Sequence, residues 1–305
     1  MSQYIAIRAL SSSFHSGHPQ VGRTGEEPNC TFKEMTVNNR TGYELTPVLA
    51  LHCSLGSSAQ WRSLAKAMPD REVIAVDLLG YGDAPGPTAV SDFTLDHELE
   101  ALEKELSKRV DTTRPLHVVG HSYGGAVAWR FALRNPRRVK SIALFEPVTL
   151  WLIKHRLETA PLRILASLTA RDVEMGLTMQ AAQRFIDFWS GQGTFSSLRP
   201  EQQSALADRM SKVRLDFAAC FAERDSLVAP GYLDMPALIM NGSAASAAMR
   251  LNIRLLWSLF SDCATEEVAG GHMAPLENRA QVDSVIAGFI ERSDHQTTRR
   301  ERLVA

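Results

Sequence analysis

The sequence predicts an α/β fold in which helices flank a mostly parallel central sheet. Two observations predict it: short apolar runs alternate with longer helical patterns from about Cys30 onward, and one of these runs leads directly into a G-x-S-x-G sequence. The chain's 305 residues allow two domains, or one large domain with an insertion. With 45% hydrophobic and 22% charged residues, the chain is neither disordered, collagen-like nor a coiled coil.

The individual elements follow in a regular order along the chain. Buried strands are predicted at 48–53, 73–76, 116–120, 141–145 and 237–240, and a further strand is predicted near 265–268. A leucine stripe over 95–110 predicts an amphipathic, solvated helix with no further role. Two more helices are predicted, one around 250–260 and one whose apolar face runs from Val282 to Ile290.

The strand signal disappears between residues 151 and 232. Helix formers and aromatic residues replace it, which predicts a helical insertion into the sheet domain. The core then comprises 30–150 and 233–292. Residues 1–29 are expected to form a flexible leader, and the polar, charged residues 293–305 are expected to be a disordered tail.

Charge and cysteine content exclude several classes of function. The chain has 33 Lys and Arg against 34 Asp and Glu, so it carries no electrostatic footprint for nucleic acid or an anionic membrane. Its four cysteines show neither CxxC spacing nor the density of a disulfide scaffold, and no apolar run reaches the 18 residues of a spanning helix. We therefore expect a cytoplasmic protein that acts on a small molecule, and the oligomeric state stays open.

Ser122 is the predicted nucleophile. It stands between Gly120 and Gly124, after a buried strand and before a helical pattern, and such a sharp turn exposes the hydroxyl beside backbone N–H groups. A serine hydroxyl needs a neighbouring base at neutral pH. His272 is the predicted base, because it follows the last strand in a tight Gly-Gly-His turn, whereas His52 and His121 are better explained as supporting hydrogen-bonding residues.

The tetrahedral intermediate of acyl transfer requires an oxyanion hole, usually two backbone N–H groups. Tyr123, directly after the nucleophile, is expected to supply one. Ser54, in the loop after the first strand, is expected to supply the other. Cys53 in the same loop is an alternative nucleophile, but without a base of its own it is better explained as a small buried thiol.

These motifs together resemble the α/β-hydrolase fold superfamily, and in particular its lid-bearing serine hydrolases, over roughly 31–292. The motifs are His52 with Gly56-Ser57-Ser58 and Trp61, Asp77 to Gly82, Gly120 to Gly125, Arg134-Asn135-Pro136 with Arg138-Val139, and Gly271-His272. The resemblance implies an α/β-hydrolase fold in which the segment 151–232 forms a helical lid after the strand ending at Glu146. One departure is Cys53, where the family usually has glycine.

A second departure concerns the acid that orients the base. Most family members carry it three residues after the glycine that ends the penultimate strand, which here is Gly242, and that position holds Ala245. Members resembling haloalkane dehalogenases take the acid from the end of the strand after the nucleophile helix, where this chain has Glu146. Glu146 is therefore the predicted acid, with a structural capping role as its alternative. Asp262 and Asp225 are remoter substitutes.

Ser122, His272 and Glu146 together predict cofactor-free and metal-free hydrolysis of a small to medium, apolar carboxylic ester through an acyl-enzyme. Carbon–carbon bond hydrolysis, lactone opening or perhydrolysis on the same residues stays open. So does a ligand-binding or signalling role on a hydrolase scaffold. A serine at position 122 argues against dehalogenase and epoxide hydrolase chemistry, since relatives with those activities have aspartate there.

Overall fold

A six-stranded, wholly parallel sheet forms the centre of the molecule in a computed structural model that describes residues 45–88, 90–223 and 232–304. Its order is β2-β1-β3-β4-β5-β6. The strands are β1 (Val48–Leu51), β2 (Val73–Val76), β3 (Leu116–His121), β4 (Val139–Phe145), β5 (Ala237–Gly242) and β6 (Cys263–Val268). All six predicted strands are thus confirmed, and the predicted leader 1–29 lies outside the described residues.

The chain reverses its direction across the sheet between β1 and β3, because β2 lies on one side of β1 and β3 on the other. In open parallel sheets, ligand sites form at the carboxyl ends of the strands that flank such a point. The register pairs Leu51 at the end of β1 with Gly120 near the end of β3. This pairing brings the loop after β1 next to the turn after β3.

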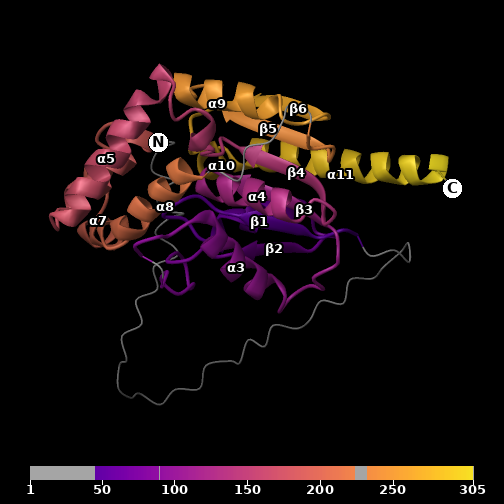
Figure 1. The fold of residues 1–305 in the computed structure, drawn as a ribbon, viewed down its shortest axis with the longest axis horizontal. Helices are drawn as coiled ribbons and strands as arrows, with labels where there is room; N and C mark the ends of the chain where they lie inside the picture. The colour runs from indigo at the N-terminus through magenta and orange to yellow at the C-terminus, as the bar shows by residue number, and fades with distance from the viewer. Residues whose placement is uncertain (1–44, 89, 224–231, 305) are drawn as a thin grey trace, which may run out of the picture.

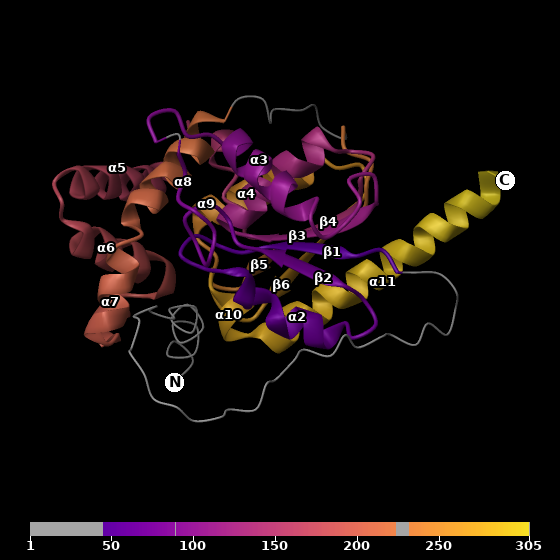
Figure 2. The same ribbon diagram turned by 90° about the horizontal axis from the view of Figure 1, so that it is seen from below.

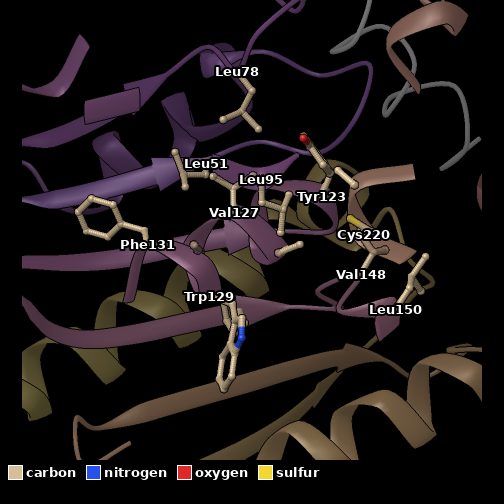
Figure 3. Close-up of a cluster of buried hydrophobic side chains, with 14 of the residues drawn as sticks. Leu51, Leu78, Leu95, Tyr123, Val127, Trp129, Phe131, Val148, Leu150 and Cys220 are labelled. Atoms are coloured by element: carbon tan, nitrogen blue, oxygen red, sulfur yellow. The ribbon is translucent and has the colours of Figure 1, made fainter. Parts of the chain in front are cut away.

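Helices cover both faces of the sheet (Figures 1 and 2). The covering helices are α2 (Arg62–Ala67), α3 (Leu95–Leu106), α4 (Tyr123–Arg134), α9 (Ala247–Trp257), α10 (Ala274–Glu277) and α11 (Arg279–Val304). Alternate strand residues serve the two faces: Leu49 and Leu51 pack with the core under α3, α4 and α9, whereas Val48 and Ala50 pack with α2 and α11. Figure 3 shows part of the first core, including Leu51 and side chains of α4.

Between β4 and β5 the described chain forms a group of helices that lies at one end of the sheet (Figures 1 and 2). They are α5 (Ala160–Glu174), α6 (Thr178–Ser190), α7 (Pro200–Ala207) and α8 (Met210–Ala222), which we call the inserted helices. They pack on one another, α5 against α6 and α8 and α6 against α7, and α8 also contacts α4 of the core. The sequence predicts a helical segment in this part of the chain.

The last helix is longer than the sequence predicted. Residues 293–305 were expected to be a disordered tail, but α11 continues to Val304. The cause lies partly in Asp294, whose carboxylate accepts from Arg71 at 2.5 Å, Lys140 at 2.7 Å and His117 at 3.2 Å. Burial alone would raise the pKa of Asp294, but these hydrogen bonds hold that pKa well below its usual range. The tail also contains neither glycine nor proline, so nothing in it stops a helix.

Candidate active site

Ser122 occupies the sharp turn between β3 and α4 that the G-x-S-x-G sequence predicts. Its backbone has φ 55° and ψ −118°, a conformation that non-glycine residues rarely adopt. The turn requires its glycines, because a Cβ on Gly124 would lie 2.3 Å from the His52 carbonyl oxygen and one on Gly120 would lie 2.6 Å from the Gly124 carbonyl oxygen. The packed glycines therefore hold the serine in place at the carboxyl end of the sheet.

His272 follows β6 and reaches back to this turn. Its Nε2 lies 2.9 Å from Ser122 Oγ, and the imidazole is buried. The indole of Trp189, from inserted helix α6, stacks on the imidazole with 3.9 Å between ring centroids and 28° between planes. One face of the predicted base is therefore covered by an aromatic ring.

A chain of hydrogen bonds fixes the backbone of His272. Burial lowers the pKa of His121 well below its usual value, so its ring is neutral. Its Nε2–H donates to the His272 carbonyl at 2.9 Å, and its Nδ1 accepts from the Gln60 amide at 3.1 Å. The Gln60 side-chain oxygen accepts from the Cys53 N–H at 3.2 Å. His121 thus connects the base to the loop after β1, the supporting role expected of it.

Glu146 joins the same constellation from the end of β4. Its Oε2 lies 2.8 Å from His272 Nδ1, and its Oε1 accepts from the Gly242 N–H at 2.9 Å. The carboxylate is almost fully buried, and the residue has a positive φ of 37°. Since Nδ1–H donates to Glu146, the lone pair of Nε2 faces Ser122 Oγ, the tautomer that can take a proton from a serine.

The other acid candidates do not meet the base. Asp262 precedes β6 and its carbonyl bonds the N–H of Ala237, so it lies at the amino end of the sheet, opposite Ser122. Ala245 follows β5 in the position that the resemblance makes usual for the acid, and its side chain has no titratable group. Asp225 lies outside the described residues.

The loop after β1 places Cys53 and Ser54 at the site. Burial raises the pKa of the Cys53 thiol to about 12, so it stays protonated and unreactive, as expected of a structural thiol. Ser54 lines the same hollow as Ser122 and Tyr123, and its hydroxyl donates to Asp216 Oδ2 at 2.6 Å. His52 supports the loop: its Nδ1 donates to the Cys53 carbonyl and its Nε2 accepts from the Leu78 N–H.

Two hollows flank Ser122 in the part of the chain that the structure describes. One, of about 280 Å³, lies beneath α8 and is lined mainly by apolar side chains, with Asp216 as its charged member. The other, of about 310 Å³, is lined by His272 and by apolar residues that include Met273 and Ile186. They share Ser54, Ser122, Phe185 and Trp189. Ser122 thus stands where two branches of one site meet.

A buried charged cluster beside the first hollow was missed by sequence reasoning. Glu98 of α3 bonds Lys212 of α8 at 2.8 Å, and Lys212 also pairs with Asp216, one turn further along α8. α3 is amphipathic and has a solvated face, as predicted, but the prediction that it is nothing more missed Glu98, which is 1% exposed. A signal was present: position 98 lies on the apolar stripe between Leu95 and Leu102, where a solvated glutamate is not expected.

The described residues offer no group of three or more His, Cys, Asp or Glu side chains suited to a metal ion. Asp77 and the glycines after it form a turn: Asp77 accepts from the N–H groups of Ser58 and Asp83, and Gly80 and Gly82 have positive φ. A Cβ on Gly82 would lie 2.2 Å from the Asp77 carboxyl carbon. These contacts explain the Gly-Tyr-Gly sequence without a phosphate ligand.

The parallel sheet holds Ser122 on a strained turn after β3, and this serine contacts a histidine from the loop after β6. These two features are typical of α/β proteins built around a nucleophile elbow. Sequence comparison agrees. A family profile described as alpha/beta hydrolase fold matches residues 46–277, and the chain belongs to this family.

Individual relatives share only parts of the chain. Lipase LipV of Mycobacterium tuberculosis is 36% identical over 100 residues, which are 33% of this chain and 36% of the lipase. A haloalkane dehalogenase of Agrobacterium fabrum is 29% identical over 137 residues, 44% of this chain and 42% of the dehalogenase. The chain therefore spans less than half the length of either of these two relatives.

Among solved structures, MenH from S. aureus superposes with a TM-score of 0.60 at 17% identity, covering 82% of this chain and 94% of MenH. At this identity the likeness shows the fold alone. No helix in residues 45–88, 90–223 or 232–304 combines the length and apolar character that crossing a bilayer requires.

Proposed function

We propose that this member of the family is a serine hydrolase that cleaves a small to medium, apolar carboxylic ester through an acyl-enzyme. One observation carries the proposal: the unbroken contact from Ser122 Oγ to His272 Nε2 at 2.9 Å and from His272 Nδ1 to Glu146 at 2.8 Å. This is the relation of nucleophile, base and orienting acid that serine hydrolysis requires.

The reaction follows from the geometry. Ser122 Oγ attacks the ester carbonyl while its proton passes to His272 Nε2, and Glu146 stabilises the imidazolium that forms. The backbone N–H groups of Ser54 and Tyr123 hold the developing oxyanion. His272 then gives the proton to the leaving alcohol, and in the second half it takes a proton from the water that hydrolyses the acyl-enzyme.

The two hollows suit the two halves of an ester. The alcohol leaves with a proton from His272, so it occupies the hollow that His272 lines, and the acyl group occupies the hollow beneath α8. The acyl hollow is lined by Val148, Val213, Phe217 and other apolar side chains, which favours an apolar acyl group. The inserted helices, within 151–232, act as a lid that supplies much of both walls. The name of the M. tuberculosis relative, a lipase, accords with ester cleavage.

The test is turnover of p-nitrophenyl esters from acetyl to octanoyl by the wild type, Ser122→Ala and Ser258→Ala. Ser258 is a matched control, because its hydroxyl only ends α9 by donating to the Leu255 carbonyl. We expect multiple turnovers by the wild type and Ser258→Ala, and a loss of at least three orders of magnitude in Ser122→Ala. A wild type without turnover, or an active Ser122→Ala, overturns the proposal and favours a binding role or a different reaction.

A further inference from the structure

The two residues proposed to hold the oxyanion are both fastened by their side chains to one buried cluster. The Ser54 hydroxyl donates to Asp216 Oδ2 at 2.6 Å, and the Tyr123 phenol donates to Glu98 Oε1 at 3.0 Å. Lys212 bridges the two carboxylates, bonding Glu98 Oε1 at 2.8 Å and Asp216 Oδ1. The loop after β1 and the start of α4 are therefore tied to each other through α3 and α8.

The cluster is closed to solvent. Its three charged side chains are between 1% and 5% exposed, and the Lys212 ammonium lies within 5 Å of the ring centroids of Tyr81, Phe93 and Tyr123. Burial alone would lower the pKa of Lys212, but the carboxylates of Asp216 and Glu98 raise it, so the ammonium stays charged. Buried ion clusters contribute little net stability, because desolvation offsets their attraction. A gain in stability is thus a poor explanation for this one.

We infer that Asp216, with Lys212 and Glu98, is a positioning residue that sets the oxyanion hole and makes its geometry depend on the seating of α8. This inference rests on the proposed function. Oxyanion donors must lie about 2.7–3.1 Å from the developing charge. The Ser54 N–H belongs to a loop, and the bond from the Ser54 hydroxyl to an inserted helix restrains that loop. While α8 packs against the core, the N–H groups of Ser54 and Tyr123 keep the relative positions that the oxyanion needs. If α8 moves away, the bond from Ser54 to Asp216 breaks and the Ser54 loop is no longer restrained.

Three variants distinguish a positioning role of Asp216 from a purely structural one. Asp216→Asn keeps the size of the side chain but removes the charge that holds Lys212 and the hydroxyls of Ser54 and Tyr81. Ser54→Ala removes only the hydroxyl and keeps the N–H. Asp172→Asn is the matched control: Asp172 is a buried aspartate of the inserted helices, paired with Arg171 and Arg184, and it touches none of the proposed site residues.

The measurements are kcat and KM for the best ester of the panel, and the affinity for a matching alkyl boronic acid. Ser122 Oγ adds to boron as its proton passes to His272, which leaves a tetrahedral boronate anion with an oxygen in the oxyanion hole. In Asp216→Asn and Ser54→Ala we expect kcat to fall between about 10- and 100-fold, the range for displaced catalytic groups, with boronate affinity falling in parallel and KM within about threefold. The double variant should be no worse than the poorer single one, since both weaken the restraint that the Ser54–Asp216 bond puts on the loop after β1.

An unchanged kcat in Ser54→Ala, an effect confined to KM, additive losses in the double variant, or an equal loss in Asp172→Asn each overturns the inference. Failure of the proposed function is seen separately, as a wild type that neither turns over esters nor binds the boronic acid. The positioning is then read from crystal structures of the two aspartate variants. It stands only if the Ser54 backbone shifts in Asp216→Asn and stays in place in Asp172→Asn.

Discussion

Replacing Glu146 with glutamine tests the proposed catalytic residues at the point where the sequence departs from the usual pattern. The side chain keeps its shape, but one carboxylate oxygen becomes an NH₂ group. Glu146 Oε1 is already engaged by the Gly242 N–H, so the amide oxygen stays there and the NH₂ group faces His272 Nδ1. His272 must then accept at Nδ1, which moves its own proton to Nε2, where it blocks proton transfer from Ser122.

The size of the effect follows from that tautomer. The same exchange of acid for amide costs about 10⁴ in kcat in the best-studied serine protease, or roughly 5.5 kcal/mol of transition-state stabilisation. We expect a loss of this order in Glu146→Gln with little change in KM, because the residue is buried behind the base and lines neither hollow.

The assay is steady-state hydrolysis of the preferred p-nitrophenyl ester by wild type, Glu146→Gln and Asp262→Asn. Asp262 is the matched control, since it is an aspartate next to a strand but at the opposite end of the sheet. A Glu146→Gln enzyme within threefold of the wild-type kcat, alongside an inactive Ser122→Ala, would refute the assignment of Glu146. An equal loss in Asp262→Asn would show that the effect is not specific to the carboxylate that contacts His272.

Two further predictions concern rings in and beside the site. Burial lowers the pKa of His52 to about 4 from its unfolded value of 6.5, so below pH 6.5 the unfolded chain binds a proton that the folded chain does not. The stability that this residue contributes is full above pH 6.5, and its share of the free energy of unfolding falls by roughly 3 kcal/mol as the pH drops to 4. Burial also lowers the pKa of His121 and of His117, so these rings add to the decline. Urea titrations across this range should show the decline and a shallower one in His52→Asn, with exposed His155→Asn as the control; a flat profile in the wild type would contradict the reasoning. Trp189→Leu removes the ring stacked on His272 and should lower kcat about 2- to 30-fold, because the imidazolium loses its cation–π partner. Phe188→Leu removes a ring that packs edge-on against Trp189 but leaves the indole on His272. It should therefore change kcat less than Trp189→Leu does, and equal effects of the two would assign both to lid packing.

Strand positions and the three central site residues were accessible from the sequence because each depends on a local pattern. Buried parallel strands are continuous apolar runs, and the G-x-S-x-G turn and the Gly-Gly-His turn are both contained in a few residues. Glu146 was predicted from the resemblance to haloalkane dehalogenases, because the usual position of the acid holds Ala245 and Glu146 stands at the end of a buried strand beside the site. The structure brings these three side chains into contact.

The charged cluster was not accessible, because its members are far apart in sequence. Ser54 and Asp216 are separated by 162 positions, and Glu98 and Lys212 by 114. The leucine stripe predicts which face of α3 is buried, but it does not predict that Lys212 of another helix pairs with Glu98. The length of α11 was missed for the same reason, since the partners of Asp294 lie on elements from the first half of the chain.

Because Glu146 follows β4 directly, two of the three proposed catalytic residues lie close together in the sequence. Ser122 and Glu146 belong to a single β-α-β unit and are 24 positions apart, while Gly242, the last residue of β5, donates its N–H to Glu146. Substitutions or insertions in the loop 243–246, between β5 and α9, therefore remove none of the proposed catalytic residues. The segment after Glu146 has no such freedom, because a change that shifts the start of the inserted helices also shifts Glu146. Changes of substrate range are therefore easier on α6, whose Phe185 and Trp189 line both hollows.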